Sequence, residues 1–147
     1  MPCYNPGMLN AILKLLGIRG APSTGPPDGA DQRKKFGGKG EDVAAAILRK
    51  NGHKILKRNY TCRRGEIDII ALYGEVICFV EVKARRPGGL FAPNRTVTAA
   101  KRRQVRRVAR YYLRSNRLLD RVCRFDIISV IQPEAGEPEV EWIRHAF

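Results

Sequence analysis

The segment 65–85, GEIDIIALYGEVICFVEVKAR, constrains the fold of this chain more than any other part of the sequence. Its two apolar runs are rich in strand-forming residues and are separated by Tyr-Gly-Glu at positions 73–75, which predicts a β-hairpin that turns there. Both runs nevertheless carry charge at their centres, where an unpaired charge in an apolar strand is costly. The charges that need an explanation are Asp68, Glu81 and Lys83.

The composition of the chain favours a single domain that binds an anionic partner. A length of 147 residues is enough for one domain with a real core, and the hydrophobic fraction of 44% is ordinary. The formal net charge of +14 is not ordinary, and ten basic residues against one acidic residue lie between Lys101 and Arg124. Nucleic acid is therefore the first candidate partner.

The N-terminal residues 1–35 are predicted to form a flexible extension, and the folded domain is predicted to span 36–147. Residues 20–32, GAPSTGPPDGADQ, have the composition of a flexible linker. Before them, residues 8–18, MLNAILKLLGI, place four apolar side chains on one helical face, so a short amphipathic helix that docks on a partner or a membrane surface competes with a marginal local helix. The run is too short to span a bilayer.

The four cysteines are predicted to be free thiols. Cys3, Cys62, Cys78 and Cys123 are far apart, and no Cys-x-x-Cys pair or histidine at ligand spacing accompanies them. Cys78 stands in an apolar run, where it acts as a small hydrophobic residue. Free thiols suit a reducing compartment, so the predicted location is cytoplasmic.

The hydrophobic patterns predict an α/β fold in which one helix precedes three strands and a second helix precedes a further strand. This last core strand is apolar on both faces and is predicted to be buried beside the hairpin. A short final strand completes the order. The predicted ranges are a helix at 41–51, strands at 53–60, 66–72 and 76–84, a helix at 98–119, and strands at 124–131 and 140–147.

Side-chain alternation places Glu81 and Lys83 on the same face of their strand, together with Ile77. Pairing about the predicted turn brings Asp68 roughly opposite residues 80–81, which makes a cluster of two carboxylates and one ammonium. The ordinary alternative is a cross-strand salt bridge at a solvated sheet edge. Because both faces of the strand also carry apolar residues, full solvation of the strand is not expected.

Glu41 is a third acidic residue that the pattern directs inward. It lies two helical turns before Leu48, on the side of the helix that also carries Ala44 and Ile47. Its carboxylate is therefore predicted to lean toward the core.

The second helix is strongly basic and has two distinct sides. Its apolar stripe consists of Val105, Val108, Ala109 and Tyr112, and the opposite side carries Arg103, Arg107, Arg110 and Arg114. Lys101 falls on the apolar stripe, where it either extends along the surface into solvent or reaches the acidic cluster or a bound phosphate. The residues predicted to bind nucleic acid are Lys101, Arg102, Arg103, Arg106, Arg107, Arg110 and Arg114.

Two carboxylates at one point would repel the phosphates that a basic protein attracts, and a divalent cation resolves this conflict. Mg²⁺, or Mn²⁺ in its place, prefers carboxylate, water and phosphate oxygens, and the predicted ligands are Asp68 and Glu81, with Glu41 binding directly or through a water. Such a cation polarises a phosphoryl oxygen and acidifies water, which leaves Lys83 to orient that water or to stabilise negative charge.

The segments GEIDII and FVEVKAR resemble the D…ExK core of the PD-(D/E)XK nuclease superfamily. The fuller pattern, from about residue 37 to 131, resembles the YraN-type uncharacterised bacterial proteins, which are relatives of archaeal Holliday-junction resolvases. It includes Gly40-Glu41, Gly65-Glu66-Ile67-Asp68, Glu81-Val82-Lys83, Lys101 and Arg124-Phe125-Asp126. The resemblance implies a restriction-endonuclease-like αβββαβ core, a mixed sheet flanked by helices, with Asp68, Glu81 and Lys83 in the catalytic positions and Glu41 as a helix-borne acid.

The leading hypothesis is a Mg²⁺-dependent endonuclease that hydrolyses phosphodiester bonds of DNA, in branched or single-stranded form. Cutting a junction would favour a homodimer, because two strands are cut symmetrically. The alternative is a non-catalytic nucleic-acid-binding protein on the same fold, although acids that face phosphate do not help a protein that only binds. A membrane-surface or partner-docking role for the extension ranks last.

Overall fold

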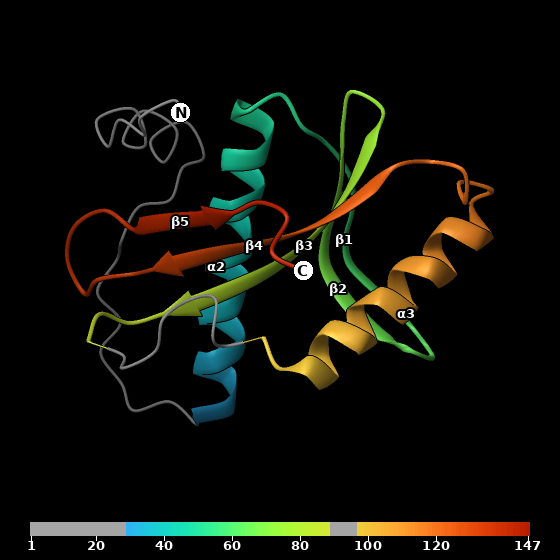
Figure 1. Cartoon of the computed structure of the whole chain (residues 1–147). Helices are drawn as coiled ribbons and strands as arrows, with labels where there is room; N and C mark the ends of the chain where they lie inside the picture. The colour runs from blue at the N-terminus through green and yellow to red at the C-terminus, as the bar shows by residue number, and fades with distance from the viewer. Residues whose placement is uncertain (1–28, 89–96) are drawn as a thin grey trace.

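The computed structural model describes residues 29–88 and 97–147, so the predicted helix near residues 8–18 and most of the predicted linker lie outside the described residues. In chain order, the elements are α2 (Gly29–Lys50), β1 (Lys54–Cys62), β2 (Gly65–Tyr73), β3 (Val76–Arg85), α3 (Ala99–Ser115), β4 (Cys123–Ile131) and β5 (Glu139–Ile143) (Figure 1). Neither of these helices has an apolar stretch long enough to cross a membrane.

The strands form one mixed sheet in the order β1-β2-β3-β4-β5. Only the β3–β4 pair is parallel, and α3 provides the crossover that a parallel pair requires. This is the α/β fold that the sequence predicted, with the αβββαβ core of restriction-endonuclease-like proteins and β5 added at the edge. The predicted position of the last core strand beside the hairpin is confirmed.

Helix α2 begins earlier than the sequence predicted, at Gly29 rather than Glu41, so residues 29–32 belong to a helix and not to the linker. The segment ADQRKK consists largely of residues that are compatible with a helix, and this outweighs the nearby glycines. Gly40 has a packing role, because a Cβ at this position would lie 2.7 Å from the Cβ of Ala84 in β3. The helix can cross the sheet closely at this point only without a side chain.

The end of α2 follows the predicted pattern. Gly52 has a φ of +80°, and the backbone N–H of His53 donates to the carbonyl of Leu48 at 2.9 Å. This glycine-dependent cap stops the helix and directs the chain into β1.

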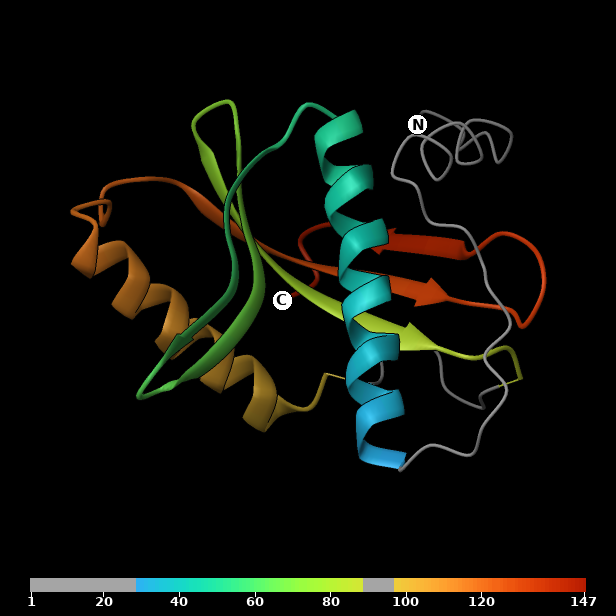
Figure 2. The ribbon, with the colours of Figure 1, turned by 180° about the vertical axis from the view of Figure 1, so that it is seen from behind.

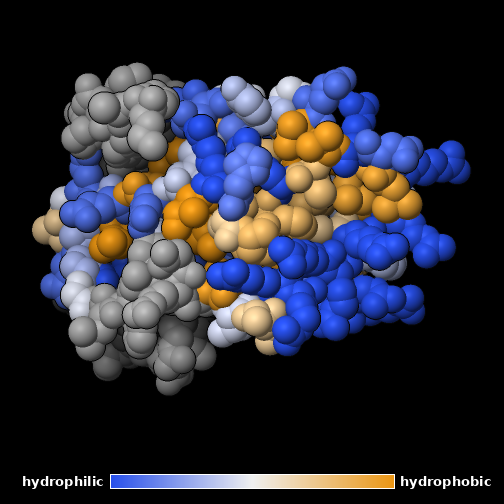
Figure 3. Space-filling view, viewed as in Figure 1, coloured by the Kyte–Doolittle hydropathy of each residue, from blue (hydrophilic) through white to orange (hydrophobic). Residues whose placement is uncertain are grey.

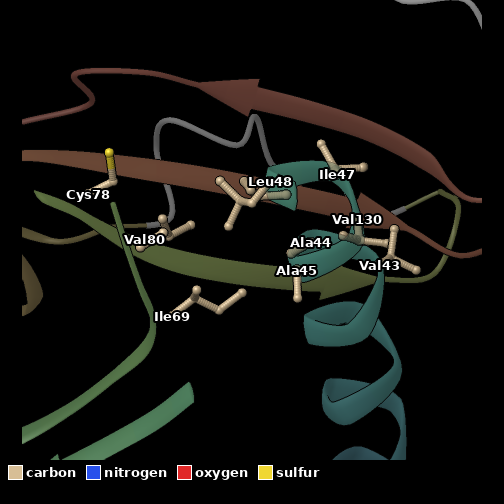
Figure 4. Close-up of a cluster of buried hydrophobic side chains, with 11 residues drawn as sticks. Val43, Ala44, Ala45, Ile47, Leu48, Ile69, Cys78, Val80 and Val130 are labelled. Atoms are coloured by element: carbon tan, nitrogen blue, oxygen red, sulfur yellow. The ribbon is translucent and has the colours of Figure 1, made fainter. Parts of the chain in front are cut away.

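The two helices cover opposite faces of the sheet (Figures 1 and 2). Against α2 lies a buried cluster made of Val43, Ala44, Ala45, Ile47, Leu48, Ile69, Ala71, Cys78, Val80, Ile128 and Val130 (Figure 4). Against α3 lies a second cluster made of Ile67, Ile70, Ile77, Phe79, Val105, Val108, Ala109, Tyr112 and Leu113. The predicted alternation along β3 is confirmed, since its two faces enter different clusters.

Helix α3 is shorter than predicted, because it ends at Ser115 rather than near residue 119. Thr98 is its N-cap, and the Thr98 hydroxyl accepts a hydrogen bond from the backbone N–H of Lys101 at 3.2 Å. At the other end Asn116 caps the helix and Arg117 takes a φ of 57°, which a helix does not continue. The predicted apolar stripe is buried and rests on the sheet.

Asp126 of β4 is fully buried and organises a polar network. Its carboxylate accepts hydrogen bonds from Arg124 Nε at 3.2 Å, from Trp142 Nε1 at 3.0 Å and from the backbone N–H of His145 at 3.2 Å. Arg124 also lies 3.0 Å from His53 Nε2, which connects the beginning of β1 to β4. The Arg-Phe-Asp motif therefore has a structural role in tying β5 and the C-terminal segment to the core.

Candidate active site

Asp68 lies where the regular alternation of β2 is interrupted. Ile67 packs into the cluster below α3 and Ile69 into the cluster below α2, although residues two apart normally share a face. Beside this point, Asn59 of β1 has a φ of 50°, a conformation that asparagine tolerates. The irregularity directs the Asp68 side chain toward β3 instead of into either cluster.

The Asp68 carboxylate takes the place of a ladder hydrogen bond. Pairing between β2 and β3 runs from Tyr73↔Val76 to Ile69↔Val80, and the Asp68 Oδ2 atom then accepts from the backbone N–H of Val82 at 2.7 Å. The predicted register, with Asp68 near residues 80–81, is confirmed. The acid of β2 is thereby fixed against the strand that carries Glu81 and Lys83.

Glu81 is the most deeply buried acid of the cluster, with 4% of its side chain exposed. Its Oε1 atom receives two ammonium groups, Lys83 Nζ at 2.8 Å and Lys101 Nζ at 3.2 Å. Its Oε2 atom is buried and has no hydrogen-bond partner within the described part of the chain. Lys101 thus reaches the acidic cluster from α3, which decides between the two alternatives that the sequence left open.

The environment makes Asp68 an unusually weak acid. Burial is the main cause, the nearby Glu81 carboxylate is the second, and Glu41 adds to both, so that the pKa of Asp68 is raised to about 7. The hydrogen bond from Val82 and the charge of Lys101 act in the opposite direction. A carboxyl group that titrates near neutrality beside a second buried acid is typical of a functional site.

Glu41 occupies the edge of this cluster. Its side chain is 18% exposed, which agrees with the predicted inward direction, and its Oε2 atom lies 3.8 Å from an Arg58 Nη atom. The same guanidinium bonds Asp42 at 2.7 Å. Arg58 could not be identified from the sequence, because a basic residue in an exposed stretch of β1 gives no signal until α2 is packed beside it.

The residues present fit a hard divalent cation held by few protein ligands. No group of three or more His, Cys, Asp or Glu side chains close enough for a metal site occurs in residues 29–88 and 97–147. Asp68 and Glu81 are two adjacent carboxylates, however, and the unpartnered Oε2 of Glu81 is a buried acceptor that a cation would satisfy. Mg²⁺ is commonly bound through one or two carboxylates with water and phosphate oxygens completing its shell.

The basic side of α3 faces solvent, as the sequence predicted. Hydrophilic side chains cover the region of α3 in the space-filling view (Figure 3), and the exposed arginines are Arg103, Arg106, Arg107, Arg110 and Arg114. Arg102 is partly buried, and its Nε donates to the Val97 carbonyl at 3.2 Å. The guanidiniums of Arg102 and Arg106 both lie 5.7 Å from the centre of the Phe147 ring.

Comparisons with known proteins connect this site to a bacterial family without an assigned activity. A family model described as "Uncharacterised protein family UPF0102" matches residues 40–130, which include Glu41, Asp68, Glu81, Lys83 and Lys101. A UPF0102 protein of Moorella thermoacetica is 44% identical over 116 residues, which cover 78% of this chain and 97% of that protein. A UPF0102 protein of Geobacter sulfurreducens is 40% identical over 120 residues, which cover 82% of this chain and 94% of that protein.

Proposed function

The chain belongs to the uncharacterised protein family UPF0102, and we propose that it is a divalent-cation-dependent endonuclease that hydrolyses phosphodiester bonds of DNA. The proposal combines three features of the molecule: an acidic pair of which Glu81 is buried, two lysines bonded to Glu81, and an exposed row of arginines on α3. The predicted resemblance to PD-(D/E)XK nucleases is consistent with the same reaction.

The observation that carries the proposal is the arrangement of Glu81. One carboxylate oxygen holds two ammonium groups and the other is buried without a partner, beside a second carboxyl group at Asp68. A structural ion pair would normally satisfy both oxygens, because an orphaned buried acceptor costs about 1–3 kcal/mol. A carboxylate that binds a cation during turnover needs one oxygen available.

Each residue then has a role that follows from its position. Asp68 and Glu81 would hold Mg²⁺ or Mn²⁺, with Glu41 at the edge of the site, where it would act through a water. When bound, the cation supplies Lewis-acid stabilisation of phosphate charge and lowers the pKa of water. Lys83, on the same strand face as Glu81, would orient the attacking water or compensate negative charge in the transition state.

The remaining basic residues would position the substrate. Lys101 reaches the cluster from α3 and can contact the phosphate that is being attacked, while Arg103, Arg107 and Arg110 on the exposed side of α3 would bind flanking phosphates. Phosphate contacts of this kind fix the position of a nucleic acid without reading its sequence. We therefore expect the shape of the DNA, branched or single-stranded, to decide the substrate more than base sequence does.

A cytoplasmic location and a homodimer are further parts of the proposal. Cys62, Cys78 and Cys123 are free, which suits a reducing compartment. Symmetrical cutting of a branched substrate requires two active sites, which a two-fold dimer would provide.

The decisive experiment is a Mg²⁺ and Mn²⁺ titration of the full chain with a panel of linear, single-stranded, flapped and four-way DNAs, each with an RNA counterpart. We expect cleavage of at least one DNA by the wild type and none by Asp68→Asn or Glu81→Gln, both of which should retain the wild-type melting temperature within a few degrees. Asp120→Asn, at an exposed loop position, is the control for the loss of one acid.

The alternative function predicts a different result. A non-catalytic nucleic-acid-binding protein would bind the panel through α3 and cut no member in either cation. In that case Asp68→Asn and Glu81→Gln would strengthen DNA binding, because each removes a negative charge near the phosphates without removing a catalytic group.

A further inference from the structure

Strand β3 carries a third charged side chain beyond Glu81 and Lys83, that of Arg85. Arg85 follows Lys83 by two residues, so alternation places its side chain on the same face of the sheet. Residues two apart on a strand are separated by about 6.6 Å. This spacing is comparable to the distance between neighbouring phosphates of an extended polynucleotide strand.

Arg85 is held in position by a buried hydroxyl group. One of its Nη atoms donates to Ser129 Oγ at 3.1 Å, and Ser129 is only 1% exposed. Ser129 is the partner of Lys83 in the parallel β3–β4 ladder. Its neighbours Ile128 and Val130 in β4 are apolar, so the serine is the exception in an otherwise apolar stretch and provides an acceptor beside the site.

A purely structural tie between strands does not account for this pair. The β3–β4 ladder already aligns the two strands from Ile77↔Cys123 to Arg85↔Ile131 through backbone hydrogen bonds. One more side-chain bond at its end adds little to the pairing of the strands. Restricting a guanidinium instead reduces the entropy lost when it binds a planar anion, and arginine is well suited to bidentate phosphate contacts.

The side-chain charges on this part of β3 change from negative at Glu81 to positive at Lys83 and Arg85, which favours a bound DNA strand that runs toward Arg85. Glu81, with Asp68 beside it on β2, is acidic, whereas Lys83 and Arg85, which follow it along β3, and the exposed Arg86 just after the strand are basic. Phosphates that follow the course of β3 toward Arg85 would be attracted.

We propose that Arg85, positioned by Ser129, binds the phosphate next to the one attacked, so that the DNA strand follows β3 from Glu81 toward Arg85. This inference rests on the proposed nuclease function, since it places the attacked phosphate beside Lys83, which is two residues from Arg85 on β3. Neither Arg85 nor Ser129 was predicted from the sequence to be a site residue. Arg85 would therefore form a phosphate-binding subsite next to the proposed catalytic residues and would determine the direction in which the DNA strand lies along β3.

Binding can be tested without cleavage, by fluorescence anisotropy of a labelled 20-nucleotide single strand and a 20-bp duplex in Ca²⁺ and in EDTA. The variants are Arg85→Gln, Arg85→Lys and Ser129→Ala, and Arg49→Gln is the matched control because Arg49 is an exposed arginine at the end of α2. We expect Arg85→Gln to bind roughly tenfold more weakly than Arg49→Gln, as for the loss of one charge-assisted hydrogen bond. Arg85→Lys and Ser129→Ala should lie between these two variants.

Equal binding by Arg85→Gln and Arg49→Gln would overturn the subsite. A melting temperature that falls in Arg85→Gln and Ser129→Ala while affinity per folded molecule stays at the control value would also overturn it, and would identify the pair as a structural tie.

The position of the phosphate is tested separately, with a substrate that carries one neutral methylphosphonate linkage next to the mapped cut. This linkage should slow cleavage by the wild type and add nothing to the defect of Arg85→Gln. An equal additional defect in both proteins would refute the assigned position. A wild type that cuts nothing would refute the nuclease function, whereas the anisotropy comparison would still decide whether Arg85 binds phosphate.

Discussion

The carboxylate of Asp68 accepts a hydrogen bond from the backbone N–H of Val82, with 2.7 Å between Oδ2 and N. Val82 stands between Glu81 and Lys83, so this bond connects the acid of β2 to the strand that carries the other two charges. It forms where the backbone pairing of β2 and β3 stops. The end of the β2–β3 pairing therefore frees the Val82 N–H for Asp68, and this bond brings Asp68 next to Glu81 and Lys83.

Replacement of Asp68 should remove cation binding and also its pH dependence. Because ionised Asp68 is needed as a ligand and its pKa is raised to about 7, Mn²⁺ affinity of the wild type should fall roughly five- to tenfold between pH 7 and pH 6. Asp68→Asn should bind Mn²⁺ much more weakly at pH 8, as measured by calorimetry. Equal binding by wild type and Asp68→Asn, with Asp120→Asn as the control, would reject the ligand assignment.

The raised pKa of Asp68 should also make the cation-free protein less stable as the pH increases. The folded protein holds the Asp68 proton up to about pH 7, whereas the unfolded chain releases it near pH 3.8. Unfolding therefore releases a proton between these pH values, so the contribution of Asp68 to stability is largest below pH 3.8 and is lost as the pH rises through 7. The melting temperature of Asp68→Asn minus that of the wild type, in EDTA, should increase over this range. A flat difference would contradict the raised pKa.

Lys83→Ala should separate catalysis from binding. If Lys83 stabilises the transition state, the single-turnover cleavage rate should fall by a factor of at least about 100 while DNA affinity changes little. If Lys83 only anchors a phosphate, affinity should fall and the rate should recover at saturating DNA. If its 2.8 Å bond to Glu81 is only structural, the main effect should be a lower melting temperature. Lys57→Ala, at an exposed position of β1, controls for charge.

Neutralising Arg103, Arg107 and Arg110 should weaken binding to all DNA sequences alike. If each arginine contacts one phosphate, the slope of log affinity against log salt should decrease by about 0.9 for each lost contact on duplex DNA. The matched control changes Arg49, Lys54 and Lys57, which are exposed on α2 and β1, to glutamine. A salt slope that changes equally in both triple variants would place the binding surface elsewhere.

The contact between Gly40 and Ala84 should be visible as an energetic coupling. Gly40→Ala brings a methyl group to 2.7 Å from the Ala84 Cβ, so overpacking should destabilise the protein by about 1–3 kcal/mol in spite of the better helix propensity of alanine. Ala84→Gly removes the obstructing group. In the double variant the loss should be smaller than the sum of the single losses, by about 0.5–3 kcal/mol in urea unfolding. Additive losses would show that Ala84 does not set the requirement for glycine.

The sequence by itself determined the elements of this fold and the identity of the charged cluster. Alternation along β3 placed Glu81 and Lys83 on one face, and the spacing of apolar residues in α3 identified its buried stripe. Both inferences depend on local geometry, because the period of a strand or a helix follows from the backbone alone. The longer α2 and the shorter α3 were missed, since helix ends depend on caps and contacts that a periodic pattern does not contain.

Only the tertiary structure decided which groups meet. Whether Lys101 extends into solvent or bonds Glu81 depends on how α3 packs on the sheet, and the proximity of Arg58 to Glu41 depends on how α2 packs beside β1. The direction of Asp68 depends on an irregularity of β2 that regular side-chain alternation does not predict. These contacts join residues that are distant in the chain, and their free energies arise from burial and electrostatics that exist only after the layers are assembled.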